Sequence, residues 1–343
     1  MDATLTAIAP LRVGIIGVGR IGRMHAELLA RRVPGAAVAA VHDAHGEVAR
    51  GVAERLGVRA ADSAQELLGA ADVDAVAICS STETHADLLV AAAAAGKAVF
   101  CEKPVSLDLA EVDRALAAVE AAGIPFQIGF NRRFDPAHAS VRDAVASGAV
   151  GAPHLVRITS RDPEPPPLAY VHVSGGIFLD MTIHDFDMAR FVTGSEIVEV
   201  YARGALRREH SFAEAGDIDT ALITLVHADG CLTAIDNSRR TSYGFDQRVE
   251  VFGDGGMAAS ENPHAHSGVV RTAVGTSAPG LPAFFVERYT PSYLREWDAF
   301  VGAVQRGQAP PVTTGDARAP LVAGLAAWRS LRENRPVRVE EIA

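Results

Sequence analysis

The sequence predicts an α/β protein with two domains, on the strength of three observations. Its 343 residues, 48% of them hydrophobic, are enough for two separate cores. Up to about residue 130, short apolar runs of strand length alternate with amphipathic runs of helical length, which is typical of a doubly wound parallel sheet. Beyond that point, longer runs of alternating apolar and polar residues indicate a large mixed, mainly antiparallel sheet. We therefore expect one domain over 1–130 and an α/β domain over 131–343, whose C-terminal helices can pack back on the first.

The first domain should contain five buried strands with helices between them. The strands are expected over 11–16, 37–42, 75–79, 98–101 and 126–130, and the helices over 20–31, 45–56, 84–95 and 108–122. Gly123 and Pro125 follow the last helix, and both residue types end helices.

The second domain should pair a broad sheet with a central helix. Its strands are expected over 154–161, 197–206, 217–227, 231–240 and 247–252, with a turn at Asp229-Gly230 and helices over 135–146, about 178–193, 292–306 and 315–333. Gly194 should end the central helix, and Gly315-Asp316 should cap the last one. Because one face of such a sheet stays open, we expect a weakly held homo-oligomer.

Composition excludes several classes of partner. The net charge is −10 and no basic block occurs, which argues against nucleic acid and anionic membranes. No apolar run reaches the roughly 20 residues of a membrane span, and the N-terminus lacks a basic leader, so we expect a cytoplasmic protein. Cys79, Cys101 and Cys231 lie far apart and match no metal-ligand spacing, so we expect reduced thiols and no metal.

A glycine-rich segment predicts a dinucleotide site. Gly17-Val-Gly19-Arg-Ile-Gly22 follows a strand and opens a helix, and Asp43 ends the next strand 21 residues past Gly22. Glycines let a pyrophosphate approach backbone N–H groups at the helix N-terminus. Asp43 would accept hydrogen bonds from ribose hydroxyls and repel a 2′-phosphate. We therefore expect NAD rather than NADP.

Two further segments follow strands at the edge where open α/β sheets bind ligands. The hydroxyls of Ser80-Ser-Thr-Glu-Thr-His85 could contact the cofactor, although Thr84 could equally cap a helix. In Glu102-Lys103-Pro104, the lysine could hold a substrate hydroxyl and stabilise a developing alkoxide, although spacing alone favours a solvated lysine. Pro104 could follow a cis peptide bond.

The segment 175–190 carries the candidate acid–base groups. Asp180, His184 and Asp187 stand in an apolar run at offsets of four and three, so they would share one face of a helix. A histidine flanked by carboxylates can move a hydroxyl proton near neutral pH. The simpler alternative is a buried core histidine with Asp180 as a helix cap. His25, by contrast, belongs to no pattern, and we assign it a packing or solvated role.

Four segments in this order, 17–22, 102–104, 129–136 and 175–187, resemble the Gfo/Idh/MocA oxidoreductase family. The later segment 237–248 is similar to the inositol 2-dehydrogenase branch of that family. The resemblance implies a Rossmann domain that binds NAD, a C-terminal α/β domain, a homotetramer, and oxidation of a cyclic polyol such as myo-inositol to 2-keto-myo-inositol. It gives catalytic roles to Lys103, Asp180 and His184.

The other site residues follow from these motifs and from the likeness. The expected cofactor-binding residues are Gly17, Gly19, Arg20, Ile21, Gly22, Asp43, Ser80, Ser81, Thr82, His85, Glu102 and Lys103, and the expected substrate-binding residues are Asn131, Arg132, Asp162, Asp187 and Tyr243. Asp187 and Arg132 could instead form a local ion pair. The chain departs from the branch where Tyr243-Gly-Phe245 stands for Tyr-Gly-Tyr, which leaves the preferred isomer open.

In the expected mechanism, His184 removes the hydroxyl proton, Asp180 orients the imidazole, and Lys103 binds the same oxygen. Lysine as the base, with histidine as its orienter, remains a second arrangement. Two other functions also stay open: a dehydrogenase of another inositol isomer or an aldose, and a nonenzymatic NAD-binding regulator. A panel of substrates distinguishes the first of these functions from a myo-inositol dehydrogenase. NAD binding without turnover of any polyol would indicate the second.

Overall fold

The computed structural model describes residues 9–342, which divide into two compact units. The first unit runs to Phe130 and includes Tyr293–Arg318, and the second comprises Asn131–Ser292 and the chain from Ala319 on. The segment Tyr293–Arg318 is thus part of the first unit, although it lies within the range 131–343 assigned to the second domain from the sequence.

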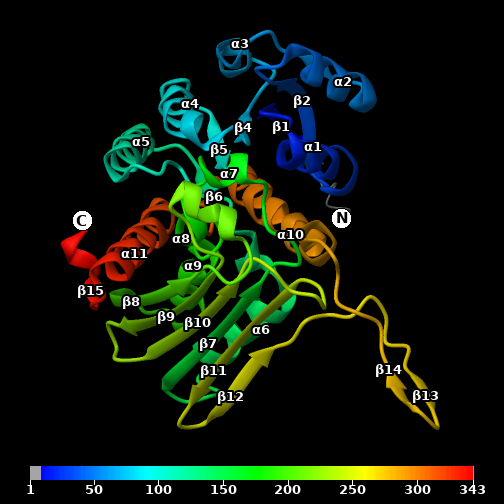
Figure 1. The fold of residues 1–343 in the computed structure, drawn as a ribbon. Coiled ribbons are helices and arrows are strands. Elements are labelled where there is room, and N and C mark those ends of the chain that lie inside the picture. Colours follow the sequence, from blue (N-terminus) through cyan, green and yellow to red (C-terminus); the bar gives the residue numbers. More distant parts are fainter. Residues whose placement is uncertain (1–8, 343) are drawn as a thin grey trace, which may run out of the picture. The chain divides into compact units, whose positions relative to one another are not determined.

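A six-stranded parallel sheet forms the centre of the first unit, in the order β3-β2-β1-β4-β5-β6 (Figure 1). Its strands are β1 (Leu11–Ile16), β2 (Ala36–His42), β3 (Arg59–Ala60), β4 (Ala75–Ile78), β5 (Ala98–Cys101) and β6 (Phe126–Ile128). The order reverses between β1 and β4, and in open α/β sheets ligands bind at that point, beyond the carboxyl ends of the strands. The five strands expected in this half are confirmed, whereas β3 was not foreseen.

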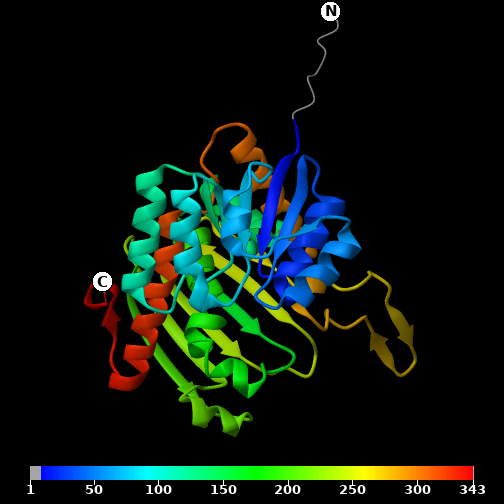
Figure 2. The ribbon, with the colours of Figure 1, turned by 90° about the horizontal axis from the view of Figure 1, so that it is seen from above.

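Helices lie on both sides of this sheet (Figure 2). They are α1 (Arg20–Arg32), α2 (Gly46–Leu56), α3 (Ala64–Gly69), α4 (Thr82–Ala94), α5 (Leu109–Ala122) and the part of α10 (Phe285–Gln305) that begins at Tyr293. Val13 and Ile15 of β1 pack with Trp297 and Phe300 of α10 in one buried cluster. On the other face, a Cβ at Gly14 would lie 2.2 Å from the Leu67 side chain, so α3 packs directly on the β1 backbone.

A seven-stranded mixed sheet forms the second unit, in the order β12-β11-β7-β10-β9-β8-β15 (Figure 1). Its strands are β7 (Pro153–Arg161), β8 (Ile197–Ala205), β9 (Thr220–His227), β10 (Leu232–Ser238), β11 (Asp246–Gly253), β12 (Gly256–Ser260) and β15 (Val337–Arg338). β7 and β10 run parallel and the other neighbours are antiparallel, which confirms the predicted mixed, mainly antiparallel sheet. Gly230, with φ of 89°, makes the expected turn between β9 and β10.

One face of this sheet is covered by helices and the other is open (Figure 1). The helices of this unit are α6 (Pro136–Ala146), α7 (Leu168–Val171), α8 (Gly176–Asp180), α9 (Ile183–Thr193), the part of α10 that ends at Ser292 and the part of α11 (Thr314–Glu333) that begins at Ala319, together with the 3-10 turns η1 (Asn131–Phe134), η2 (His210–Ala215) and η3 (Val339–Glu341). Side chains from α6, α8, α9 and α11 form one buried cluster with the strands. On the open face, Leu222, Leu232, Phe252 and Met257 are exposed.

The central helix is interrupted, which corrects the expectation of one helix over about 178–193. α8 ends at Asp180 and α9 begins at Ile183. Thr182 lies in the break, and its hydroxyl contacts the Ile177 carbonyl (3.2 Å) and the Asn237 side chain (2.5 Å). Such side-chain hydrogen bonds compete with a regular helical ladder, and periodicity in the sequence does not reveal the tertiary bond to Asn237.

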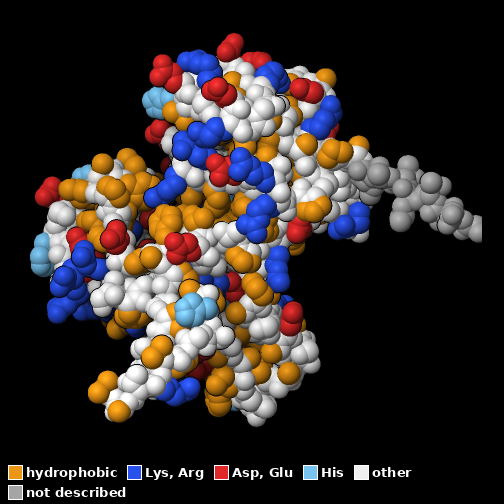
Figure 3. All heavy atoms as spheres, turned by 90° about the vertical axis from the view of Figure 1, so that its right-hand side faces the viewer, with side chains coloured by type: hydrophobic (Ala, Val, Ile, Leu, Met, Phe, Trp, Pro, Cys, Tyr) orange, Lys and Arg blue, Asp and Glu red, His pale blue; other side chains and the backbone are white. Residues whose placement is uncertain are grey.

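A small hairpin, β13 (Val270–Thr272) with β14 (Gly275–Ser277), was not foreseen. It extends from the second unit in Figure 1, and Figure 3 views the molecule from that side. Val269, Val270 and Val274 are exposed here, and the Val274 side chain is 98% exposed. An isolated two-stranded hairpin is marginal in water, so this segment contributes little to the stability of the unit.

Candidate active site

The glycine-rich loop joins β1 to α1 and leaves one position open. Gly17 has φ of 87°, and a Cβ there would lie 2.4 Å from the Ser80 backbone nitrogen. A Cβ on Gly22 would lie 1.8 Å from the Gly17 carbonyl oxygen. At Gly19, the N-cap of α1, no described atom lies within 4 Å of the place a Cβ would take. Chain packing thus requires the outer glycines, whereas the middle one leaves room for a ligand at the helix N-terminus, beside Arg20 and Ile21.

Asp43 is held against this loop. It follows β2, and its Oδ2 accepts a hydrogen bond from the Val18 N–H (2.9 Å) while Oδ1 accepts one from the His45 N–H (2.9 Å). Both bonds orient the carboxylate at the carboxyl edge of the sheet. Open space at Gly19 and an oriented acid at Asp43 fit the pyrophosphate and ribose of a dinucleotide.

The hydroxyl-rich loop after β4 joins directly onto α4. Ser81 is the N-cap of α4 without a side-chain capping bond, and Thr82 is the first helical residue. The Ser80 and Thr84 hydroxyls lie 2.6 Å apart, and Thr84 donates to the Ser81 carbonyl. The capping role considered for Thr84 is therefore wrong. Cofactor contacts of Ser80, Ser81 and Thr82 stay predictions.

His85 links two loops at this edge of the sheet. Its ring nitrogens lie 2.8 Å from the Pro104 carbonyl oxygen and 3.0 Å from the Ser80 carbonyl oxygen, and the side chain is buried. Burial lowers the pKa of His85, against the effect of the two backbone hydrogen bonds. Since both nitrogens meet backbone oxygens, the predicted contact of His85 with the cofactor would involve only the carbon edge of the ring.

Glu102 and Lys103 follow β5 directly, and the Lys103–Pro104 peptide bond is cis. The Glu102 carboxylate already has two partners inside the first unit, the His25 imidazole (2.8 Å) and the Lys103 backbone N–H (3.2 Å). Each carboxylate oxygen of Glu102 thus already accepts a hydrogen bond within the protein. The contact of Glu102 with the cofactor stays a prediction.

Asp180 and His184 lie on either side of the break between α8 and α9. From residue 176 to residue 189, these two alone are partly exposed and all others are buried. Asp180 Oδ1 accepts from the Tyr170 hydroxyl (2.9 Å), and Oδ2 lies 3.2 Å from an Arg239 guanidinium nitrogen. Two donors on one carboxylate stabilise its ionised form. The fold therefore presents a carboxylate and an imidazole from an otherwise buried segment.

The ion pairs of this region differ from the local pair considered for Asp187 and Arg132. Both oxygens of Asp187 accept from Arg133, at 2.6 and 2.8 Å. Arg132 donates instead to Asp185 (2.7 Å). Each residue is thus paired, but with a neighbour of the expected partner.

The remaining predicted substrate residues belong to different elements of the second unit. Asn131 begins η1 and is 3% exposed, and its amide nitrogen has no hydrogen-bond partner among residues 9–342. Asp162 follows β7, where burial raises its pKa to about 6 despite the attraction of Arg132. The Tyr243 hydroxyl donates to Asp246 (2.8 Å) and accepts from an arginine of β7 (2.8 Å), and its ring is half exposed.

Comparison with known proteins identifies the family. The model described as "Oxidoreductase family, NAD-binding Rossmann fold" matches residues 11–130, and the GFO/IDH/MocA C-terminal domain matches residues 138–259. The chain belongs to the Gfo/Idh/MocA oxidoreductase family. NAD is its cofactor, in agreement with the sequence prediction.

Named relatives match the chain over nearly its whole length. It is 46% identical over 333 residues to the myo-inositol 2-dehydrogenase of Thermotoga maritima, which covers 97% of this chain and 99% of the relative. It is 43% identical to an inositol 2-dehydrogenase of Rhizobium meliloti, over 96% of this chain and 99% of the relative. A crystal structure of a probable dehydrogenase from Thermotoga maritima superposes with a TM-score of 0.95 at 47% identity, covering 97% of this chain and 100% of the other.

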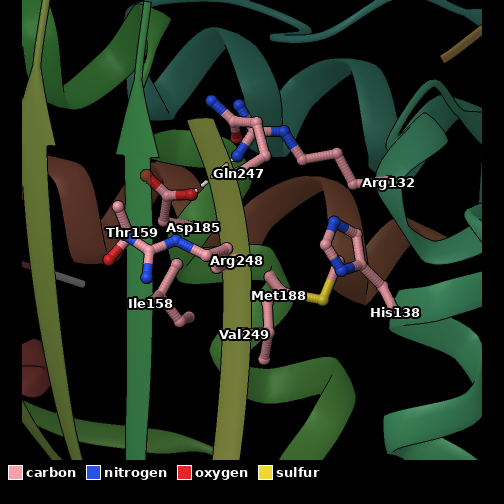
Figure 4. A pocket seen from close by; sticks show the side chains of 9 residues that line it. All are labelled: Arg132, His138, Ile158, Thr159, Asp185, Met188, Gln247, Arg248 and Val249. Carbon is pink, nitrogen blue, oxygen red and sulfur yellow. Dashed lines mark hydrogen bonds and ion pairs between the residues drawn. The ribbon is translucent and has the colours of Figure 1, made fainter. Parts of the chain in front are cut away.

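Next to His184 in the chain, Asp185 of this Gfo/Idh/MocA protein belongs to a buried polar network that sequence reasoning missed; Figure 4 shows its members Arg132, Asp185 and Gln247. Asp185 accepts from Arg132 (2.7 Å) and from the Asn237 amide (2.8 Å), and Ser160 joins Arg132 to Gln247. Burial raises the pKa of Asp185 to about 6, although both donors act to lower it. The network holds the start of α9 to β7 and β10. A carboxylate inside an apolar run was the available signal, but the sequence does not show that its partners come from β10 and η1.

Arg239 is the second residue that sequence reasoning missed. It is 1% exposed and lies between Asp180 (3.2 Å) and Asp217 (3.4 Å). Its motif was noted in the sequence, but no role was assigned because Asp217 lies far away in the chain.

The described part of the chain has neither a metal-binding cluster nor a membrane-spanning helix. Between residues 9 and 342, no three or more His, Cys, Asp or Glu side chains are grouped so as to hold a metal ion. None of the helices in that range has the length and hydropathy that crossing a membrane requires.

Proposed function

We propose that this protein catalyses the NAD-dependent oxidation of a cyclic polyol, with myo-inositol as substrate and 2-keto-myo-inositol as product. The observation that carries the proposal is the full-length likeness to two named inositol 2-dehydrogenases, at 46% and 43% identity. The oriented Asp43 carboxylate and the open space at Gly19 support the cofactor half of the reaction.

The chain supplies three groups for moving the proton. His184 takes the proton of the reacting hydroxyl, and Asp180 stabilises the imidazolium that results. Lys103 donates a hydrogen bond to the same oxygen, so that negative charge developing there is stabilised. NAD, when bound, supplies the hydride acceptor. Proton uptake by Lys103, with His184 as its orienting partner, is the alternative arrangement of the same groups.

Asn131, Arg132, Asp162, Asp187 and Tyr243 are proposed to bind the other hydroxyls of the polyol. A buried polar atom without a partner costs roughly 1–3 kcal/mol, so the buried Asn131 amide nitrogen gains from a bound hydroxyl. Arg132 and Asp187 are already paired in the structure, so they would contact substrate through remaining donors or lone pairs.

Turnover of a substrate panel, followed as NADH absorbance, tests this function. We expect myo-inositol to be oxidised faster than other inositols and aldoses. A preference for another isomer or an aldose would mean that this compound, and not myo-inositol, is the substrate. NAD binding without turnover of any polyol would contradict the proposal that the protein is an enzyme.

The lysine content offers a matched control for the catalytic roles. Lys97 and Lys103 are the only lysines in the sequence. Lys97 donates to the Ala70 and Val73 carbonyls, which is a structural role. We expect Lys103→Ala and His184→Ala to lower kcat by at least about a hundredfold while NAD still binds. Lys97→Arg should retain kcat, and near-normal turnover in either of the first two variants would remove that residue from the mechanism.

We also propose a cytoplasmic homotetramer. The open face of the seven-stranded sheet supports association, because four large apolar side chains are exposed on it. Analytical ultracentrifugation tests the tetramer, and cell fractionation tests the location. A monomer at micromolar concentration would contradict the first.

A further inference from the structure

His25 is buried in the first unit, inside a cage of aromatic rings. It lies on α1 and is fully buried, with the rings of Phe100, Tyr293 and Trp297 at centroid distances of 5.3, 5.5 and 5.7 Å. Its two nitrogens have different partners. Nε2 lies 2.8 Å from Glu102 Oε1, and Nδ1 lies 2.9 Å from the Trp297 indole nitrogen.

The indole decides where the proton of His25 resides. An indole N–H is a donor only, so it needs an acceptor at His25 Nδ1. Nδ1 therefore carries no proton, and His25 is a neutral imidazole with its one N–H at Nε2. That N–H points at Glu102 Oε1, which must accept it. An imidazolium would direct two N–H groups at each other across the 2.9 Å contact with Trp297.

The second oxygen of Glu102 is held by the residue next in the chain. Oε2 accepts the backbone N–H of Lys103 (3.2 Å), and a Cβ on Gly129 would lie 3.3 Å from the Glu102 carboxyl carbon. The Glu102 side chain is 15% exposed. A carboxyl that accepts on both oxygens has no need of a proton, so these contacts select the ionised form.

The charges around Glu102 agree with an ionised carboxylate. Burial acts to raise the pKa of Glu102, whereas the hydrogen bonds from His25 and from the Lys103 backbone, together with the nearby Lys103 charge, act to lower the pKa. Burial and the Glu102 charge raise the pKa of the Cys79 thiol, and the same two causes raise the pKa of Cys101. Both thiols are therefore neutral, and neither adds a negative charge beside the Glu102 carboxylate.

We propose that Trp297 and His25 are positioning residues for Lys103: the indole fixes the imidazole tautomer, the imidazole fixes the Glu102 carboxylate, and the carboxylate fixes the Lys103 backbone. This inference rests on the catalytic role proposed for Lys103. The chain of contacts starts on α10, passes through α1 and ends just after β5. A displacement of about 1 Å at a reacting group costs roughly a hundredfold in rate, which gives such a support a measurable effect.

The tautomer is tested without any turnover, by nitrogen NMR of the full chain with 15N-labelled histidine. Among the twelve histidines, we expect the signal that disappears in His25→Gln to come from an imidazole with a protonated Nε2 and a bare Nδ1 at pH 7. In Trp297→Phe, an aromatic ring stays beside Phe100 but the indole N–H is lost, so the Nδ1 signal should move. A doubly protonated His25, or a signal unchanged by Trp297→Phe, would overturn the proposal.

Kinetics of Glu102→Gln test the last link. We expect kcat to fall roughly tenfold to a hundredfold with the Kd for NADH within about twofold of wild type. If Glu102 instead binds the cofactor, the Kd would rise and kcat at saturation would be retained, which overturns the positioning role. His227→Gln is the matched control for His25→Gln, because His227 is also a buried histidine whose two ring nitrogens contact Ser195 and Thr233. The kcat of His227→Gln should be unchanged.

The lysine pair allows a direct view of Lys103. After reductive 13C-methylation, the two lysines give separable signals, and Lys97→Arg assigns them. Glu102→Gln should move the Lys103 signal and leave that of Lys97 in place. If wild type oxidises no polyol, the proposed function fails, while the tautomer and the Lys103 signal still decide whether the contacts exist. An unmoved Lys103 signal with unchanged kcat would refute the positioning chain.

Discussion

Gly19→Ala should separate cofactor binding from folding. Gly19 has φ of −62° and an extended backbone, and no described atom lies within 4 Å of the added Cβ. We therefore expect the free energy of unfolding to change by less than about 1 kcal/mol, because alanine adopts negative φ without strain. The added methyl group instead occupies the approach to the N-terminus of α1. A tenfold rise in the Kd for NADH corresponds to about 1.4 kcal/mol, and we expect at least that.

Two measurements on the same variants check this reasoning. Urea denaturation gives the unfolding free energy, and quenching of protein fluorescence by NADH gives Kd. Gly22→Ala is the matched comparison, because its Cβ would lie 1.8 Å from the Gly17 carbonyl oxygen, and it should lose about 1–3 kcal/mol of stability. If Gly19→Ala bound NADH as wild type does, the dinucleotide would not approach this loop closely. If Gly19→Ala lost as much stability as Gly22→Ala, the space around residue 19 would be too small for a methyl group, contrary to the structure.

Three further outcomes are expected. Asp43→Ala should weaken NAD binding and raise kcat/KM with NADP relative to NAD, and an unchanged cofactor ratio would mean that another residue contacts the ribose. Asp185→Ala should cost about 3–5 kcal/mol in urea denaturation at pH 8, because the buried Arg132 and the Asn237 amide both lose their acceptor. The pKa of Asp185 is about 6 in the folded protein against an ordinary value of 3.8, so the folded wild type binds more protons than the unfolded chain between about pH 4 and 6. This carboxyl therefore makes the unfolding free energy of the wild type rise as pH falls through that window. The variant should lack that contribution, and an equal dependence of unfolding free energy on pH in both proteins would contradict the raised pKa. Phe252→Glu, on the open sheet face, should give a smaller assembly in sedimentation velocity, whereas an unchanged sedimentation coefficient would place the subunit contact elsewhere.

Much of the fold could be predicted because the strands and helices are long and strongly patterned. β5 spans the predicted 98–101, and α1 and α5 differ from prediction by one residue at one end. The elements that were missed are short: β3 and β15 have two residues each, the strands of the β13–β14 hairpin have three each, β12 has five, and the helix α3 has six. Segments this short carry too few residues to show a period. The break between α8 and α9 was missed for another reason, since Thr182 bonds to Asn237, 55 residues further along the chain.

The site divides in the same way. Gly17, Gly19, Gly22 and Asp43 could be named from the sequence because a local motif on one strand, loop and helix carries them. Arg239 and the Asp185 network could not, because their partners are separated by 22 to 59 positions and pair only when strands and helices pack.

What the sequence by itself determined is the order of strands and helices, the nucleotide loop and the kinds of acid and base that the chain carries, because each depends on neighbours within a few residues. What only the tertiary structure decided is which of those groups are already engaged. His25, which the sequence left without a role, accepts an indole N–H from residue 297 and donates to Glu102, and Asp187 pairs with Arg133 rather than Arg132. The physical reason is that burial obliges each polar group to find a partner, and folding chooses that partner by proximity in space.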